Sequence, residues 1–212
     1  MEILRKILDL FLHVDKNLAV VIAQYGALTY GILFLVIFME TGLVVAPFLP
    51  GDSLLFASGA LAALGSFQIW LLYPLLLVAA VVGDTVNYWI GDFLGKEVFE
   101  KNSRFFKKEY LEEAEEFYRK HGGKAIVFAR FVPIVRTFAP FVAGVSKMSY
   151  KHFIAYNIVG GFAWVSLFLI GGFLFGNIPF VKENFHYVVI LIILISVVPI
   201  FWEGAKRRKN HK

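Results

Sequence analysis

The sequence contains no cysteine. A disulfide framework, a thiolate metal site and a thiol nucleophile are therefore excluded. Its five histidines show no spacing typical of metal ligands. The chain also carries no nucleophile elbow and no glycine-rich phosphate loop. We therefore expect no metal, no cofactor and no enzymatic activity.

Charge is also scarce in this chain. Only 17% of residues are charged and 58% are hydrophobic, whereas soluble domains have about 25% charged and about 45–50% apolar residues. One small core cannot hide so much apolar surface, so lipid is the expected solvent. The net charge of +5 comes from short loops and the C-terminus, which is typical of cytoplasmic anchoring rather than nucleic-acid binding. We therefore expect the membrane, and no nucleic acid, as a partner.

The apolar runs divide a single membrane domain, 1–212, into two similar halves. The first half, 25–94, contains a proline-broken segment at 47–65, and the second, 124–176, contains another at 124–146. Each half ends in a long apolar span that carries a Gly-x-x-x-Gly pair, a spacing typical of packed membrane helices. A broken apolar segment favours a re-entrant hairpin over a solvated loop or a full span. The pattern predicts an all-α integral membrane fold with about four transmembrane helices and an inverted repeat of two opposed re-entrant helical hairpins. Coincidence among glycine- and proline-rich segments is the alternative to a true repeat.

The other segments are amphipathic, basic or apolar. Residues 1–16 predict an amphipathic helix at the membrane interface, and residues 95–123 predict a charged amphipathic helix at the surface. Residues 185–202 predict a final transmembrane helix, followed by a basic tail at 203–212. Because basic segments stay on the cytoplasmic side, we expect both termini in the cytoplasm. The two hairpins then enter the membrane from opposite sides.

Four charged residues interrupt the apolar segments. Glu40 lies in an otherwise apolar span, Asp52 follows Pro-Gly in the first broken segment, and Arg130 and Arg136 flank Pro133 in the second. An isolated charge in hydrocarbon costs about 3 kcal/mol or more, so we expect these four residues to share a wet or ligand-filled chamber. The guanidinium forks suit a phosphate headgroup, and the carboxyl groups are candidate proton carriers because burial favours their neutral form.

Structural roles are open for the same four residues. Glu40 could lie near the outer interface, and Asp52 could cap the helix that follows it. Each arginine could form a purely structural ion pair with Glu40 or Asp52. Four further residues lie within predicted spans, where polar groups usually hold helices together. They are secondary candidates for ligand contact: Asp84, Asn87, Asn157 and Trp164.

Several motifs together resemble the DedA family, also called the SNARE-associated or VTT-domain family. They are Glu40, Pro-x-x-Pro-Gly-Asp at 47–52, Gly-Asp-x-x-x-Tyr-x-x-Gly at 83–91 and Arg130-Phe-x-Pro-x-x-Arg136 followed by Ala143-Gly144. The resemblance implies an inner-membrane protein with two opposed re-entrant loops. Family members are implicated in proton-motive-force-dependent transport and envelope homeostasis, and some are proposed to return undecaprenyl phosphate across the membrane. The family's acidic pair maps to Glu40 and Asp52, and its essential arginine pair to Arg130 and Arg136.

These features lead to a functional hypothesis. The protein is expected to carry a lipid phosphate, most simply undecaprenyl phosphate, across the cytoplasmic membrane for recycling, with transport coupled to protons. The alternatives are a proton-coupled small-ion or drug antiporter, a phospholipid scramblase or flippase, a lipid-modifying enzyme and a scaffold. A homo-oligomer is compatible with the sequence.

Overall fold

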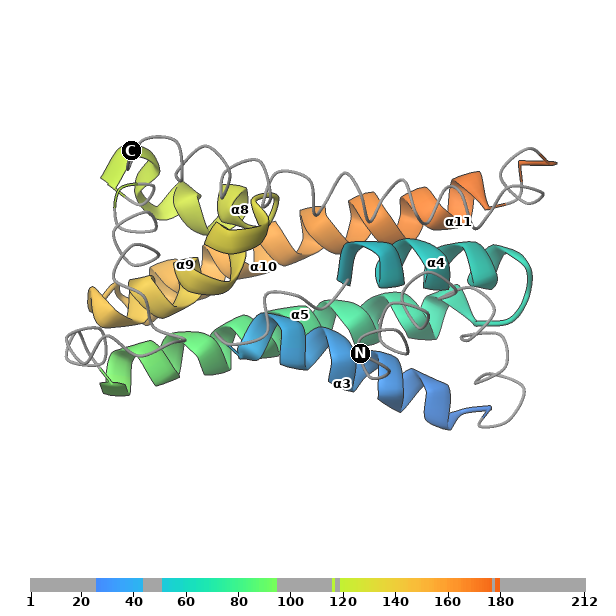
Figure 1. Cartoon of the computed structure of the whole chain (residues 1–212), viewed down its shortest axis with the longest axis horizontal. Helices are drawn as coiled ribbons and strands as arrows, with labels where there is room; N and C mark the ends of the chain where they lie inside the picture. The colour runs from blue at the N-terminus through green and yellow to red at the C-terminus, as the bar shows by residue number, and fades with distance from the viewer. Residues whose placement is uncertain (1–25, 44–50, 95–115, 117–118, 177, 180–212) are drawn as a thin grey trace, which may run out of the picture. The chain divides into compact units, whose positions relative to one another are not determined.

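The computed structural model describes residues 26–43, 51–94, 116, 119–176 and 178–179. Every regular element in these residues is a helix (Figure 1). The all-α prediction is therefore confirmed for the described part of the chain. The segments predicted at 1–16, 185–202 and 203–212, and most of 95–123, lie outside the described residues.

Two helices of the described chain are long and apolar enough to cross a membrane. The first is α5, Ile69–Leu94; the second consists of α10 (Tyr150–Val165), the π-helical turn η2 (Ser166–Ile170) and α11 (Gly171–Phe175). Each covers 26 residues, or about 39 Å at about 1.5 Å per residue, against about 30 Å of hydrocarbon. Trp70 and Phe93 are exposed near the two ends of α5, an arrangement typical of aromatic side chains at both membrane interfaces.

Two shorter helices occupy the first half of the sequence. Helix α3, Leu28–Gly42, lies in the apolar span that carries Glu40, and α4, Gly51–Ala63, lies within the first broken segment. With 13 residues, α4 reaches only about 20 Å, which is too short to cross the hydrocarbon. Nearly all of its side chains are buried, because its glycine, alanine and serine residues allow close contact with neighbouring helices.

Pro133 divides the second broken segment. Helix η1, Gly122–Lys124, leads into α8, Ala125–Ala129, and α9, Pro133–Val145, follows after a short gap. Pro133 cannot donate a backbone hydrogen bond and disfavours a helical conformation in the residue before it. Val132 is accordingly extended, at φ −117° and ψ 106°. The break places Arg130 at the end of α8 and Arg136 one turn into α9.

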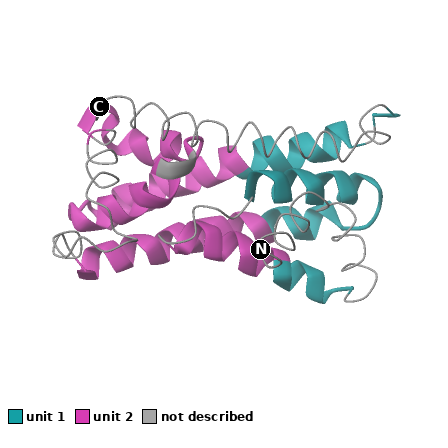
Figure 2. Cartoon of the chain, viewed as in Figure 1, with its two compact units in different colours: residues 1–32, 50–74, 165–212 teal, residues 33–49, 75–164 magenta. Residues whose placement is uncertain are grey.

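The chain forms two compact units. Unit 1 contains residues 1–32, 50–74 and 165–212, and unit 2 contains residues 33–49 and 75–164 (Figure 2). Each unit therefore combines the broken segment of one half with the end of the long span of the other half.

Glycine allows close helix packing in unit 1. A Cβ atom on Gly172 of α11 would collide with the carbonyl oxygen of Phe56 in α4, and one on Gly59 of α4 would collide with that of Leu169 in η2. These two glycine contacts hold α4 against the end of the second long span. The hydroxyl groups of Tyr73 in α5 and Ser166 in η2 are hydrogen-bonded at 2.7 Å and join the two long spans.

Unit 2 has the corresponding contacts between α9 and α5. A Cβ atom on Gly91 of α5 would collide with the carbonyl oxygen of Phe141, and one on Gly144 of α9 would collide with that of Tyr88. In both units a glycine on the span faces the backbone of the short helix, and a glycine on the short helix faces the backbone of the span.

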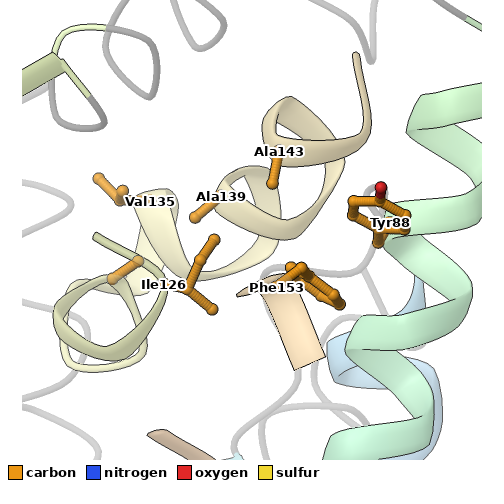
Figure 3. Packing of buried hydrophobic residues seen from close by; sticks show 7 residues of the cluster. Tyr88, Ile126, Val135, Ala139, Ala143 and Phe153 are labelled. Atoms are coloured by element: carbon orange, nitrogen blue, oxygen red, sulfur yellow. The ribbon is translucent and has the colours of Figure 1, made fainter. Parts of the chain in front are cut away.

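An apolar cluster fixes the second broken segment within unit 2. Figure 3 shows Tyr88 of α5 beside Phe153 of α10, near Ala143 of α9. The rings of Tyr88 and Phe153 are stacked, with centroids 4.5 Å apart. Ile126 and Ala129 of α8 and Val135 and Ala139 of α9 complete the cluster. This packing fixes α8 and α9 against α5 and α10, and so sets the backbone positions of Arg130 and Arg136.

Candidate functional site

Both predicted arginines lie in unit 2 with their side chains buried. Arg130 is 2% exposed and Arg136 is 5% exposed. Two charged groups withdrawn from water in this way require compensation from carboxylates or hydrogen-bond acceptors. Helices α3, α5 and α10 supply that compensation.

Arg136 pairs with Glu40. Its Nη2 donates a 2.8 Å hydrogen bond to Oε1 of Glu40, which comes from α3. Glu40 is completely buried, so its carboxylate does not extend to the protein surface as a side chain reaching for the interface would. The predicted meeting of Glu40 with one of the arginines is present.

Arg130 pairs with a different carboxylate from the one expected. Its Nη2 donates to Oδ2 of Asp84 on α5 and to Oδ1 of Asn157 on α10, at 2.5 Å in each case. The sequence suggested Glu40 or Asp52 as the structural partner of this arginine and ranked Asp84 and Asn157 as secondary. The partner of Arg130 differs from the expected one because α5 and α10 enclose the end of α8, where Arg130 lies.

Gly160 makes room for the Arg130 side chain, with Gly161 in ordinary contact beside it, and the sequence analysis missed this pair. A Cβ atom on Gly160 would lie 3.1 Å from Cδ of Arg130, and one on Gly161 would lie 3.5 Å from its Nη2. Two adjacent glycines inside an apolar span are a signal that could have indicated a neighbouring bulky side chain, since glycine in a helix interior is destabilising by itself.

Trp164 lies beside both guanidinium groups. Its ring centroid is 5.9 Å from Cζ of Arg130 and 5.2 Å from Cζ of Arg136. The ring is fully buried, and in such surroundings the cation–π attraction is stronger than at an exposed site. Trp164, a secondary candidate from sequence, therefore stabilises two like charges near one another.

Asn87 connects helices instead of meeting the arginines. Its Nδ2 donates to the carbonyl oxygens of Thr41, at 3.1 Å, and Thr137, at 2.8 Å. These bonds tie α5 to α3 and α9, the two helices that carry Glu40 and Arg136. Asn157 combines both roles, because its Nδ2 donates to the carbonyl oxygen of Val81 at 3.0 Å while its Oδ1 accepts from Arg130.

Asp52 lies in unit 1, so its predicted meeting with the arginines of unit 2 stays a prediction. It is buried, at 8% exposure, inside the first turn of α4. A carboxylate there complements the positive end of the helix dipole, but Asp52 belongs to α4 itself and does not precede it as the capping role considered from sequence requires. Within the described residues no group of three or more histidine or acidic side chains could hold a metal ion.

Comparison with known proteins identifies the family. The VTT domain family model matches residues 49–174, which include both arginines, Asp84 and Asn157. The chain is 52% identical over 202 residues to Protein DedA of Escherichia coli (strain K12), covering 94% of this chain and 92% of that protein. The chain belongs to the DedA family of VTT-domain proteins.

Other relatives extend this finding. An uncharacterized membrane protein of Mycobacterium leprae (strain TN) is 44% identical over 179 residues, covering 82% of this chain and 80% of that protein. Inner membrane protein YqjA of Escherichia coli (strain K12) is 34% identical over 203 residues, covering 95% of this chain and 92% of that protein. No solved structure matches the chain. This DedA-family chain is a membrane protein, in agreement with its two long apolar helices.

Proposed function

We propose that this protein transports a lipid phosphate, most simply undecaprenyl phosphate, across the cytoplasmic membrane for reuse, without chemically changing it. The observation that carries the proposal is the pair of buried arginines on one tryptophan ring, in a membrane protein. Guanidinium forks bind phosphate oxygens in bidentate fashion and keep their charge at any physiological pH. The polyprenyl tail would stay in lipid while the headgroup crosses.

Proton coupling is part of the proposal. In unit 2 each arginine is paired with one carboxylate, Arg136 with Glu40 and Arg130 with Asp84. An incoming phosphate competes with these carboxylates, and a displaced carboxylate in a dry site favours its neutral, protonated form. We assign proton exchange to Glu40 and Asp52, as the resemblance to the family implies.

The proposed route is alternating access between two inverted halves. Support comes from the matching glycine contacts, Gly172 with Phe56 in unit 1 and Gly91 with Phe141 in unit 2. Opposed broken helices near the membrane midplane are a common way to build a substrate site in secondary transporters. The proposed topology is multi-pass with both termini in the cytoplasm, following the distribution of basic residues.

The test is transport in reconstituted vesicles. The full chain is inserted into liposomes with a fluorescent polyprenyl phosphate, and its movement between leaflets is followed with and without a pH gradient. We expect gradient-dependent movement for the wild type and none for Arg130→Ala. A labelled phosphatidylglycerol distinguishes general scrambling, and release of inorganic phosphate distinguishes an enzyme. Equal movement in empty and protein-containing vesicles would reject the proposal.

A further inference from the structure

Arg130 is only partly satisfied by its neighbours. Its Nη2 has two acceptors, whereas its Nε and Nη1 have none among the described residues, although the side chain is almost fully buried. Oδ1 of Asp84 likewise has no hydrogen-bond partner in the described part of the chain. Buried polar atoms are nearly always hydrogen-bonded in proteins, so each of these three needs an explanation.

The hydrogen bonds of Arg130 are concentrated on one atom. Arg130 is bound through one terminal nitrogen that is shared by an acid and an amide, from α5 and α10. A guanidinium has two bidentate edges, Nη1 with Nη2 and Nε with Nη2, so a phosphate that binds Arg130 in bidentate fashion needs Nη2 together with one of the unpartnered donors. Asp84 therefore holds the one nitrogen that both edges share, and a bidentate phosphate must compete with its carboxylate for that nitrogen.

We propose that Asp84 is an internal competitor for the anion site, a positioning residue that holds Arg130 when no phosphate is bound and is displaced when phosphate binds. The inference rests on the proposed function, and the ligand chemistry is a phosphate monoester. Asp84 lowers the affinity of Arg130 for phosphate and thereby permits release. A residue that only orients Arg130 for its ligand would have the opposite effect on affinity.

Binding is measured on the detergent-purified full chain with three probes: inorganic phosphate, a short polyprenyl phosphate and the matching polyprenyl alcohol. Asp84→Asn keeps the size of the side chain and removes the competing charge. We expect the variant to bind both phosphates at least about tenfold more tightly than the wild type, and neither protein to bind the alcohol at the site. Binding of the lipid phosphate alone would identify the headgroup source as lipid, and equal binding of inorganic phosphate would identify the phosphate group itself as sufficient.

Transport in vesicles supplies the second readout. Asp84→Asn is expected to lower both the lipid concentration at half-maximal rate and the maximal rate, because release becomes slower. A purely structural loss would lower the rate without raising the affinity. The matched control is Asp92→Asn on the same helix, where the acid pairs at 2.9 Å with Lys147 in an exposed position. The control should leave the lipid concentration at half-maximal rate and the maximal rate unchanged.

A further measurement does not depend on Asp84→Asn, which removes the charge partner of Arg130. The chain has five aspartates, so isotope labelling of aspartate gives few carboxylate bands in an infrared difference spectrum. Phosphate is expected to shift a band in the wild type that is missing from the difference spectrum of Asp84→Glu and present in that of Asp92→Glu. Phosphate binding without any aspartate band shift, or weaker binding in Asp84→Asn, would overturn the inference.

The two proposals can fail separately. If Asp84→Asn binds phosphate more tightly but no lipid crosses the membrane, the proposed function fails and the competition stands. If lipid crosses the membrane but Asp84→Asn binds phosphate no more tightly than the wild type, the competition fails and the proposed function stands.

Discussion

At the residue scale, the buried charges of unit 2 are balanced in pairs. Moving a charged group out of water costs several kcal/mol even after relaxation, and removing one partner of a buried pair typically costs about 3–5 kcal/mol. Glu40 and Asp84 each offset one arginine, and Trp164 lies close to both guanidinium groups. The site is therefore close to neutral at rest, which is the condition under which an anion can exchange with a carboxylate.

The fork of Arg136 can be tested by replacing it with lysine. Arg136→Lys keeps the charge opposite Glu40 but removes the planar pair of donors. We expect transport of polyprenyl phosphate in vesicles to fall about ten- to a hundredfold, because a lysine ammonium binds phosphate as a point charge.

The control for this substitution is Lys147→Arg, the reverse exchange at an exposed position paired with Asp92. Exposed ion pairs contribute about 0–1 kcal/mol, so this variant should transport at the wild-type rate. Near-normal transport by Arg136→Lys would remove the bidentate contact from the mechanism.

At the element scale, one face of α5 explains the Gly-Asp-x-x-x-Tyr-x-x-Gly motif. Asp84, Asn87, Tyr88 and Gly91 recur at helical spacing and therefore share one side of the helix. Each has a separate contact: Asp84 with Arg130, Asn87 with the backbones of α3 and α9, Tyr88 with Phe153, and Gly91 with the backbone of α9. The motif is thus a packing surface that also supplies one acid to the site.

Two adjacent glycines of α11 test the close packing of unit 1. A Cβ atom on Gly172 would collide with the Phe56 backbone, whereas one on Gly171 would meet nothing within 4 Å. We expect Gly172→Ala to destabilise the protein by about 1–3 kcal/mol through overpacking. Gly171→Ala is expected to be neutral or to stabilise by up to about 1 kcal/mol, because alanine favours the helix.

Thermal unfolding of the two variants in one detergent measures this difference directly. Because the two positions are neighbours with the same substitution, general effects on insertion and expression are matched. Equal midpoints for Gly171→Ala and Gly172→Ala would contradict the proposed contact between α11 and α4.

At the scale of the whole molecule, each compact unit contains parts of both sequence halves. Helix α4 of the first half packs with α11 of the second in unit 1, and α9 of the second half packs with α5 of the first in unit 2. Neither half can form its short-helix contact alone. We therefore expect that the halves, expressed as separate chains, fold only when they are present together.

The absence of cysteine makes the predicted topology directly measurable, since every cysteine variant carries a single thiol. Ser66 lies between α4 and α5, and Ser149 lies between α9 and α10; both are exposed. If the two hairpins enter from opposite sides, as the sequence predicts, these two serines lie on opposite sides of the membrane. A membrane-impermeant maleimide should label Ser66→Cys in intact cells and Ser149→Cys only after the membrane is opened. Labelling of both variants from the same side would reject the inverted arrangement.

The sequence by itself determined the features that have local or solvent causes. Pro133 prevents α8 and α9 from forming one continuous helix and begins α9, because its ring removes a donor and restricts Val132. The long apolar runs predict α5 and the second span by length alone. The high cost of a charge in hydrocarbon predicts that Glu40, Arg130 and Arg136 are buried close to one another in a shared site. The combined motifs indicated the family.

Only the tertiary structure decided which charges meet. Asp84 is 46 positions from Arg130, and Glu40 is 96 positions from Arg136. These pairings follow from which helix faces pack together, which no local rule determines. The close approach at Gly160 and the packing of α5 and α10 around the end of α8 bring Asp84 and Asn157 to Arg130, whereas the sequence analysis considered Glu40 or Asp52 as its partner.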